Sequence, residues 1–262
     1  MKPIIKYRSY GAQLIQVEPD NIFYQSPLCS LLQSSSLRGG QPIIFPQFAD
    51  RGPIKKHGIA RDVDWKIIVD ERTVYRHRLI LTKEFFDNEI INWPCAAKIT
   101  LDVEYTLGTI RQVFEICNTG HYEFSWTGGL HPYFSVKDTQ LASLVGLSGV
   151  PYEDRYSQGK NFTGPEILKW GEAACEKLFD SAPNIILDTG LNKIYLHTTG
   201  FDQWMVWNPG RQGCKDISDL PDDDWQKFVC IEPVCVQRPI NLKPSEKFKG
   251  KFVISYDKFT EI

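Results

Sequence analysis

The sequence predicts an all-β protein built as a large antiparallel sandwich or barrel. Aromatic residues make up 13% of the 262 residues, and 19 glycines and 16 prolines favour strands and turns over helices. The segment from Ala97 to Leu107 alternates strictly between apolar and polar residues, which is typical of an antiparallel strand with one wet face. Similar short segments recur at spacings of about 8–12 residues, and this spacing indicates a sandwich or a barrel.

The expected strands follow one another along most of the chain. In order they are residues 12–17, 22–26, 65–70, 74–82, 97–107, 110–117, 122–126, 184–187, 193–197, 203–207, 227–232 and 251–256. Residues 150–180 break the pattern, and there we expect a long polar loop over 151–165 and a short helix over 172–179. Because no repeat, low-complexity tract or linker is visible, we expect one domain over residues 1–262.

Composition excludes several classes of protein. A formal net charge of -2 argues against nucleic acid as the main partner. No apolar run approaches the ~18 residues needed to cross a bilayer, and the N-terminal segment lacks the apolar core of a signal peptide. Seven cysteines are scattered without CxxC spacing, which indicates free thiols in a reducing compartment and no zinc site. We therefore expect a cytoplasmic protein that binds no membrane.

The segment from Leu37 to Trp65 is rich in Gly and Pro and carries three candidate binding residues. Arg38 opens it, and His57 and Arg61 close it. Arginine offers a planar fork suited to phosphate oxygens, and a neutral histidine offers a further donor. No P-loop is present, so a nucleoside triphosphate is not implied. The alternative interpretation is a surface crossover with solvated charges.

A histidine and a glutamate each precede a proline where a strand is expected to end. In WTGGLHPYF this residue is His131, and in KFVCIEPV it is Glu232. Histidine suits proton transfer near neutral pH, and a carboxylate among apolar strand residues is costly unless it is paired or used. The two could therefore face each other as acid and base. The alternatives are a histidine bonded to a backbone carbonyl and a glutamate in an ion pair at the sheet edge.

Two further motifs carry weaker signals. Trp204 and Trp207 lie on opposite faces of an expected strand and could supply a flat wall for a sugar, although tryptophan is more often a core residue. The acidic run from Asp222 to Asp224 is expected to be a solvated turn, because it lacks the spacing of a calcium loop.

Five motifs taken together, LRGGQPIIFPQF, HGIAR, GGLHPYF, VWNPG and DLPDDDWQKFVCIE, occur in an order that resembles a known family. The chain is similar, over residues 10–255, to the glucose-6-phosphate 1-epimerase branch (hexose-6-phosphate mutarotases) of the aldose 1-epimerase superfamily. This resemblance implies a galactose-mutarotase-like β-sandwich with the sugar in a cleft on one face. It also implies a cytoplasmic enzyme that uses no cofactor and no metal.

The resemblance also implies roles for six residues. The catalytic histidine and glutamate of the family correspond to His131 and Glu232, and its substrate-binding residues correspond to Arg38, His57, Arg61 and Glu176. The chain departs from the family at Pro132, which replaces Thr or Ser, and at Lys56, which stands where Gln is common. Glu176 is one methylene longer than the family's aspartate.

The expected reaction interconverts the α and β anomers of a hexose 6-phosphate by general acid and base catalysis. Glu232 is expected to act as the base and His131 as the acid, and nearby carboxylates such as Glu176 are expected to favour protonated His131. The expected partner is a small-molecule sugar phosphate, bound by a monomer. A mutarotase of unphosphorylated aldoses and a non-catalytic sugar-binding sandwich are the alternatives.

Overall fold

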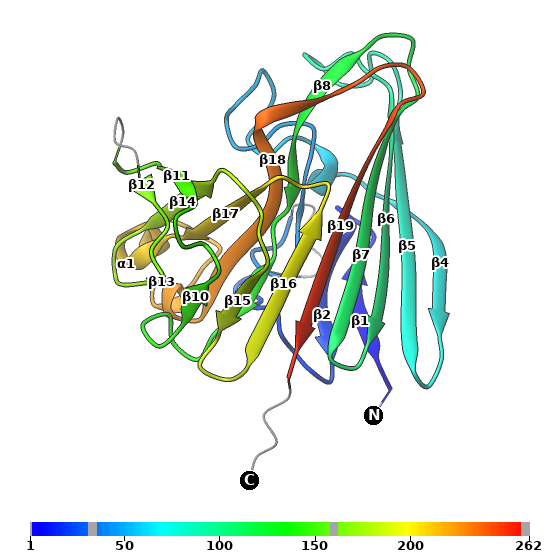
Figure 1. The fold of residues 1–262 in the computed structure, drawn as a ribbon. Helices are drawn as coiled ribbons and strands as arrows, with labels where there is room; N and C mark the ends of the chain where they lie inside the picture. Colours follow the sequence, from blue (N-terminus) through cyan, green and yellow to red (C-terminus); the bar gives the residue numbers. More distant parts are fainter. Residues whose placement is uncertain (1, 31–35, 158–161, 258–262) are drawn as a thin grey trace.

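The computed structural model describes residues 2–30, 36–157 and 162–257, which form two large antiparallel sheets (Figure 1). A separate hairpin of β1 (Ile4–Arg8) and β2 (Gln13–Glu18) lies beside them. Helical structure in these ranges is limited to α1 (Gly210–Lys215) and the 3-10 turns η1 (Ala60–Asp62) and η2 (Asp224–Gln226). None of the helices in the described ranges is long and apolar enough to cross a membrane. The predicted all-β antiparallel fold is confirmed.

The first large sheet has nine strands and contains the most regular strand of the sequence. Its spatial order is β13 (Ile167–Lys169), β10 (Ser143–Val145), β15 (Ile185–Asp188), β16 (Lys193–Thr199), β19 (Lys247–Tyr256), β7 (Thr109–Asn118), β6 (Ala97–Thr106), β5 (Arg76–Phe85) and β4 (Lys66–Arg72). Residues of β6 alternate between buried and half-buried along its whole length, as the apolar-polar alternation predicts. It pairs with β5 and β7 along that same length, so the polar face has a fixed register.

The second large sheet has eight strands and is organised around one long strand, β18 (Phe228–Leu242). Its other strands are β12 (Phe162–Thr163), β11 (Pro151–Asp154), β14 (Cys175–Phe179), β17 (Gln203–Asn208), β8 (Phe124–Leu130), β3 (Ile43–Ile44) and β9 (Tyr133–Ser135). On one side β18 pairs with β17. On the other side it pairs first with β9 and then with β8.

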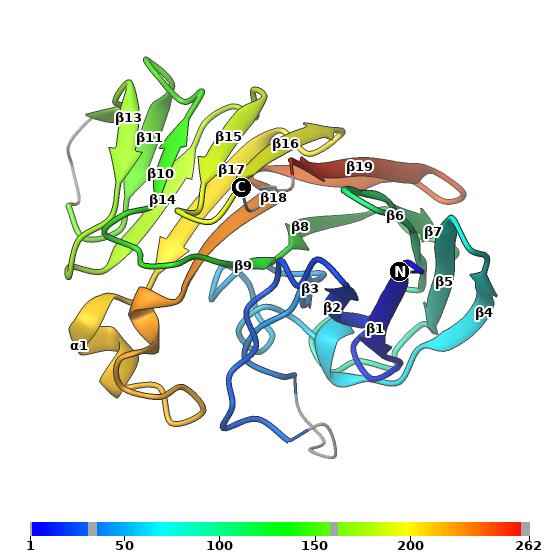
Figure 2. The ribbon, with the colours of Figure 1, turned by 90° about the horizontal axis from the view of Figure 1, so that it is seen from below.

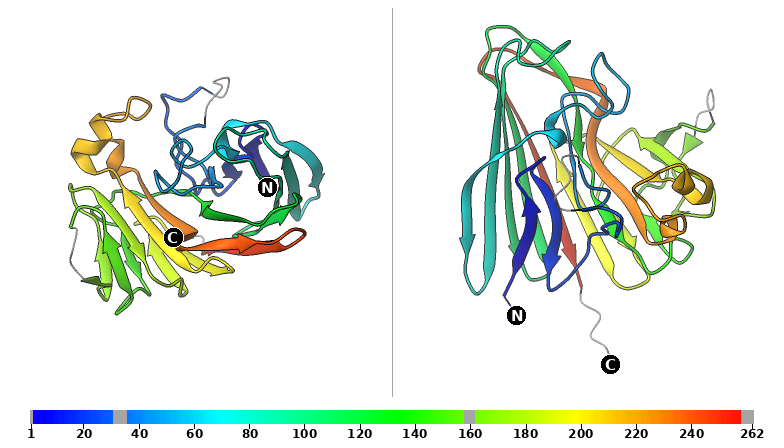
Figure 3. Two further views of the ribbon diagram at one scale, coloured as in Figure 1. Left: turned by 90° about the horizontal axis from the view of Figure 1, so that it is seen from above. Right: turned by 180° about the vertical axis from the view of Figure 1, so that it is seen from behind.

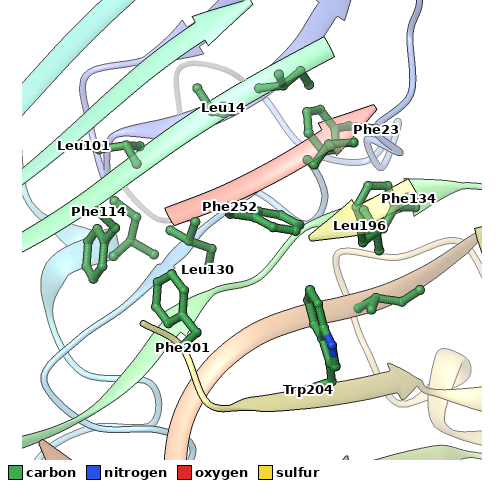
Figure 4. Packing of buried hydrophobic residues seen from close by; sticks show 14 of the residues in the cluster. Leu14, Phe23, Leu101, Phe114, Leu130, Phe134, Leu196, Phe201, Trp204 and Phe252 are labelled. Carbon is green, nitrogen blue, oxygen red and sulfur yellow. The ribbon is translucent and has the colours of Figure 1, made fainter. Parts of the chain in front are cut away.

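The hydrophobic core lies between the two large sheets. Side chains from both sheets and from the segment before β3 belong to one buried cluster, and Figure 4 labels Leu14, Phe23, Leu101, Phe114, Leu130, Phe134, Leu196, Phe201, Trp204 and Phe252. Burial of apolar area on this scale is the main contribution to folding stability. One face of the eight-stranded sheet is therefore used for packing.

The other face of the eight-stranded sheet is covered by two connecting segments. The segment between β2 and β4 (blue to cyan) and the segment between β17 and β18 (gold) lie on the side of β18 and β9 that faces away from the nine-stranded sheet (Figures 2 and 3). The two motifs that carry Arg38, His57 and Arg61 both belong to the first of these segments. This arrangement brings loop residues over strand residues on one face.

The helix predicted over residues 172–179 is wrong, because Cys175–Phe179 forms strand β14 between β11 and β17. Its residues have good helix propensity, but a helix of eight residues is marginal without packing. In the strand, Cys175, Leu178 and Phe179 are buried and the backbone pairs on both edges. The loop predicted over residues 151–165 is also partly wrong, because β11 and β12 pair there; residues 158–161 lie outside the described residues.

The large hydrophobic cluster that both sheets share predicts one cooperative unfolding transition for the chain. Since side chains of both large sheets share the cluster, loss of either sheet exposes the core face of the other. Differential scanning calorimetry should therefore show one peak, and tryptophan fluorescence and far-ultraviolet circular dichroism should give the same midpoint. Two separate peaks would contradict the prediction that residues 1–262 form one domain.

Candidate active site

A pocket of about 220 Å³ lies on the loop-covered face of the eight-stranded sheet. It is lined by all six residues singled out in the sequence, namely Arg38, His57, Arg61, His131, Glu176 and Glu232. They come from five separate parts of the chain: the loop before β3, the segment ending in η1, the β8–β9 connection, β14 and β18. The structure therefore brings the six together, while their individual roles stay predictions.

Cross-strand pairing explains how three strands supply the floor of the pocket. Glu176 of β14 lies opposite Trp207 of β17, and Met205 of β17 lies opposite Glu232 of β18. Directly opposed residues share a face of the sheet, so all four side chains point to the same side. Trp204 points the other way and is a buried core residue, so only Trp207 of the two tryptophans can serve as a wall for a sugar.

Glu232 lies inside a strand, which corrects the prediction that β18 ends before Pro233. The strand continues to Leu242. On one side β18 pairs with β9 as far as Cys230 and resumes with β8 at Val234, so Pro233 faces the interruption between these two neighbours. On its other side Pro233 pairs with Trp204 of β17. A missing N–H costs little on a side where no residue of a neighbouring strand is paired with it.

His131 is held by the tight approach of β8 to its neighbours. A Cβ atom at Gly129 would lie 2.1 Å from the carbonyl oxygen of Pro233, and the φ angle of Gly129 is +156°. Only glycine tolerates both conditions. The backbone N–H of His131 donates to the carbonyl of Pro42 at 2.9 Å, and its ring stacks on Tyr133 with centroids 4.8 Å apart. The ring is therefore fixed against β18.

The His131 and Glu232 side chains meet at the bottom of the pocket and are nearly inaccessible to solvent. His131 Nδ1 lies 3.4 Å from Glu232 Oε1, and the exposed fractions of the two residues are 7% and 1%. Neither His131 Nδ1 nor Glu232 Oε2 has a hydrogen-bond partner among the described residues. Buried polar atoms without partners are costly, and in a pocket they are groups that a ligand can satisfy.

Burial favours the neutral form of both groups. The pKa of Glu232 is raised well above its usual range, first by burial and then by the carboxylate of Glu176. The pKa of His131 is lowered well below its usual range by burial and then by His57, Arg61 and Arg38. The expectation that nearby carboxylates keep His131 protonated is therefore wrong for the free pocket, because burial and the surrounding cations outweigh them.

His57 is a neutral donor beside His131. The two rings are 5.8 Å apart and edge to face, and Phe48 packs against the other side of His57 at 5.6 Å. His57 Nδ1 accepts a hydrogen bond from the backbone N–H of Ala49 at 3.3 Å, so the proton of the neutral ring is on Nε2. Burial, Arg61 and Lys56 lower its pKa to about 3, so the ring stays neutral at physiological pH.

The two arginines of the pocket differ in their partners. Arg38 donates from Nε to Asp219 at 3.0 Å and from Nη1 to the hydroxyl of Tyr133 at 3.2 Å, and both partners raise its pKa. Arg61 donates from Nη2 to the carbonyl of Lys56 at 3.3 Å, and its Nε is buried without a partner among the described residues. Burial lowers the pKa of Arg61, which remains a cation. Arg61 therefore retains more capacity to bind an anion.

The segment between β17 and β18 supports Arg38 from outside the pocket. Asp219 on this segment forms an ion pair with Arg38. Asp224 accepts a hydrogen bond from the hydroxyl of Tyr24 and forms an ion pair with Lys227. Asp224 is buried, so the prediction of a solvated turn holds for Asp222 and Asp223 but is wrong for Asp224. Burial of the Asp224 carboxylate is tolerated because it has two partners, Tyr24 and Lys227.

Sequence reasoning missed one charged residue of the pocket, Arg155. It lies in the stretch predicted to be a loop, where nothing in the local pattern distinguished it from a solvated arginine. It reaches the pocket because β11 pairs with β14. In the described parts of the chain, no three His, Cys, Asp or Glu side chains gather into a group that could hold a metal ion.

Comparison with known families gives a match over nearly the whole chain. The family described as aldose 1-epimerase matches residues 5–255. A relative from Cenchrus ciliaris, provisionally named glucose-6-phosphate 1-epimerase, is 29% identical over 94% of this chain and 79% of its own length. A relative from Escherichia coli with the same provisional name is 27% identical over 85% of this chain and 76% of its own length.

Solved structures share the fold. A protein of Salmonella typhimurium, provisionally described as a mutarotase (YeaD), superposes with a TM-score of 0.88 at 21% identity, covering 98% of this chain and 88% of that chain. Galactose 1-epimerase from Lactobacillus acidophilus superposes with a TM-score of 0.77 at 14% identity, covering 97% of this chain and 91% of its own. The predicted galactose-mutarotase-like architecture is confirmed by these likenesses.

The buried carboxyl group predicts that Glu232→Gln stabilises the protein at neutral and higher pH. Because the pKa of Glu232 is raised in the folded state, the unfolded chain releases this proton first, and stability falls as pH rises above about 4.5. Glutamine removes this loss. We expect the variant to gain at least ~1 kcal/mol of unfolding free energy at pH 8 and little at pH 4, as measured by urea denaturation.

The exposed Glu84 supplies the control, since Glu84→Gln should leave the unfolding free energy nearly unchanged at both pH values. An equal or lower stability of Glu232→Gln at pH 8 would show that the carboxyl group is not desolvated in the folded protein.

Proposed function

The chain belongs to the aldose 1-epimerase family, and from this premise we propose that it interconverts the α and β anomers of a hexose 6-phosphate. Membership of the family makes the chain an isomerase that acts on a sugar at its anomeric carbon. The proposal adds the phosphate and the residues. One observation carries it: a buried carboxyl and imidazole pair shares a pocket with two arginines.

The chemistry requires one proton acceptor and one proton donor. In the proposed reaction Glu232 takes the proton of the anomeric hydroxyl, the bond between C1 and the ring oxygen breaks, and His131 gives a proton to that oxygen. The product is the open-chain aldehyde, and rotation about the bond between C1 and C2 followed by ring closure yields the other anomer. No metal or cofactor is needed, because the aldehyde carries no charge that requires stabilisation.

The protonation state of the pair is compatible with this reaction. A neutral imidazole with a protonated carboxyl holds the same number of protons as an imidazolium with a carboxylate, so one internal transfer converts the resting form into the reactive form. In the free pocket Arg38 and Arg61 oppose the imidazolium. A phosphate dianion bound to these arginines would offset their charge and favour proton transfer from Glu232 to His131.

The phosphate is proposed to bind Arg61 and Arg38. Support comes from the buried Nε of Arg61, which lacks a partner among the described residues, and from the neutral Nε2 donor of His57 nearby. Charge-assisted hydrogen bonds to an arginine fork are about twice as strong as neutral ones. The provisional names of the two curated relatives refer to the same class of substrate.

An unphosphorylated aldose is the second candidate substrate, and one contact favours it. Asp219 already pairs with Arg38 at 3.0 Å and reduces the positive charge that this arginine can offer to an anion. In that case Arg38 would contact ring hydroxyls.

We further propose that the enzyme works as a monomer in the cytoplasm. All seven cysteines are free, as in a reducing compartment, which supports the cytoplasm. Size-exclusion chromatography with light scattering would test the first point, and a dimer mass would contradict it.

The acid and base are predicted to act as a unit. Glu232→Gln and His131→Asn should each slow the exchange between the anomers of glucose 6-phosphate by ~10²-fold or more, because each removes a positioned proton-transfer group. The double variant should be little slower than the slower single variant. Exchange is measured by magnetisation-transfer NMR, and near-normal exchange by Glu232→Gln would rule out its role as the base.

The arginines are predicted to discriminate phosphorylated from free sugars. Arg61→Ala and Arg38→Ala should each lower kcat/KM for glucose 6-phosphate by about tenfold or more and leave the weaker use of glucose nearly unchanged. Arg78→Ala on strand β5, where Arg78 pairs with Asp102, serves as the control. Equal losses on both sugars for both pocket arginines would instead assign the chain to unphosphorylated aldoses.

A further inference from the structure

An ion pair at the mouth of the pocket connects Glu176 to a residue that no motif predicts. Arg155 Nη1 lies 3.0 Å from Oε1 and 3.2 Å from Oε2 of Glu176. The backbone N–H of Arg155 also donates to the carbonyl of Glu176 at 3.1 Å, so the main chains of the two residues are joined as well. Both side chains line the sugar pocket. The contact is therefore part of the pocket wall.

The two partners differ in their exposure to solvent. The side chain of Glu176 is 17% exposed and that of Arg155 is 50% exposed. A carboxylate that is largely buried needs a partner, whereas an arginine at the surface does not. The long side chain of glutamate has several rotatable bonds, and the guanidinium limits the positions that its carboxylate adopts. The contact thus matters more for the glutamate than for the arginine.

Glu176 also lies close enough to the proposed base to influence it. The two carboxyl groups are on the same face of the sheet, one on β14 and one on β18, with β17 between them. After burial, the charge of Glu176 is the main cause that raises the pKa of Glu232. A cation held on Glu176 opposes this effect, because the field of a close ion pair falls off faster than that of a single charge.

We propose that Arg155 is a positioning residue of the reaction, which fixes the carboxylate of Glu176 against the sugar hydroxyls and shields Glu232 from the charge of that carboxylate. The inference rests on the proposed function. It adds a residue whose effect passes through Glu176 and not through contact with the reacting atoms. A purely structural ion pair at the rim would affect neither sugar use nor the titration of Glu232.

Other groups around Glu232 set the background for this effect. The other cations on the pocket are Arg38, Lys56 and Arg61. The remaining titratable neighbours are His131 and His57 from the loop side, Tyr133 of β9 and Cys230 of β18 itself. Substitutions at Arg155 and Glu176 leave all of these in place, so differences between variants report the charge of the pair alone.

The experiment is a double-mutant cycle with two readouts. Arg155→Gln, Glu176→Gln, the double variant and Arg155→Lys are compared for kcat/KM in anomer exchange and for the ¹³C NMR titration of the Glu232 carboxyl carbon, which Glu232→Gln assigns. Arg76→Gln is the matched control. Arg76 forms a similar ion pair with Glu104 at 3.0 Å and its side chain is 41% exposed, but it lies on β5 of the nine-stranded sheet and does not line the sugar pocket.

The charges of the variants determine the expected titration. The net charge of the pair is zero in the wild type, -1 in Arg155→Gln, +1 in Glu176→Gln and zero again in the double variant. The midpoint of Glu232 should therefore rise in Arg155→Gln, fall in Glu176→Gln, and return toward the wild-type value in the double variant. Arg155→Lys keeps the charge and should keep the midpoint.

The kinetic readout should follow a different pattern. Arg155→Gln should lower kcat/KM by about tenfold, because the carboxylate of Glu176 loses its fixed position. Once Glu176 is replaced, removal of Arg155 should have little further effect, and Arg155→Lys should recover part of the loss. If Arg155→Gln matches Arg76→Gln in either readout, the proposal is wrong.

Failure of the proposed function would look different. If the wild type exchanges the anomers of glucose but not those of glucose 6-phosphate, the substrate assignment fails. The Arg155 cycle is then run on glucose, and the titration of the ligand-free enzyme is unaffected. Thermal unfolding of each variant checks that the half-exposed Arg155 can be replaced without loss of the fold.

Discussion

The chemistry of the pocket depends on the burial of a carboxyl group and an imidazole side by side on one face of a sheet. Glu232 alternates along β18 with core residues such as Ile231, so its strand cannot move without disturbing the hydrophobic core. His131 is held by the glycine-mediated approach of β8 and by its stack on Tyr133. Two polar groups that would be solvated in the unfolded chain are thereby kept dry, which costs stability and prepares them for proton transfer.

The surroundings of this pair determine how it is charged. Three basic groups approach His131 from the loop side, and one carboxylate approaches Glu232 from the sheet side. Both influences act in the same direction as burial and favour the neutral forms. A dianionic substrate acts in the opposite direction, so the charge of the substrate and the protonation of the pair are coupled through the pocket. Asp219 reduces the positive charge that Arg38 presents to the pocket, and Arg155 reduces the negative charge that Glu176 presents to Glu232.

Local reasoning failed where pairing with distant strands decided the structure. Residues 172–179 have the composition of a helix, yet they complete a sheet because β11 and β17 offer hydrogen bonds on both edges. Pro233 predicts the end of a strand, but β18 continues because the proline pairs with Trp204 of β17 and faces the interruption between β9 and β8 on its other side. Arg155 carried no local signal, since its relation to Glu176 depends on the pairing of β11 with β14.

The sequence by itself determined the all-β class, the alternation of Ala97–Thr106 and five of the pocket residues, because side-chain periodicity and short motifs are local properties. The sixth pocket residue, Glu176, came only from the resemblance to the family. Only the tertiary structure decided that these six residues meet, that Glu232 lies inside a strand and that His131 is neutral in the free pocket. The physical reason is that cross-strand pairing and desolvation depend on contacts between segments far apart in the chain. No local pattern contains that information.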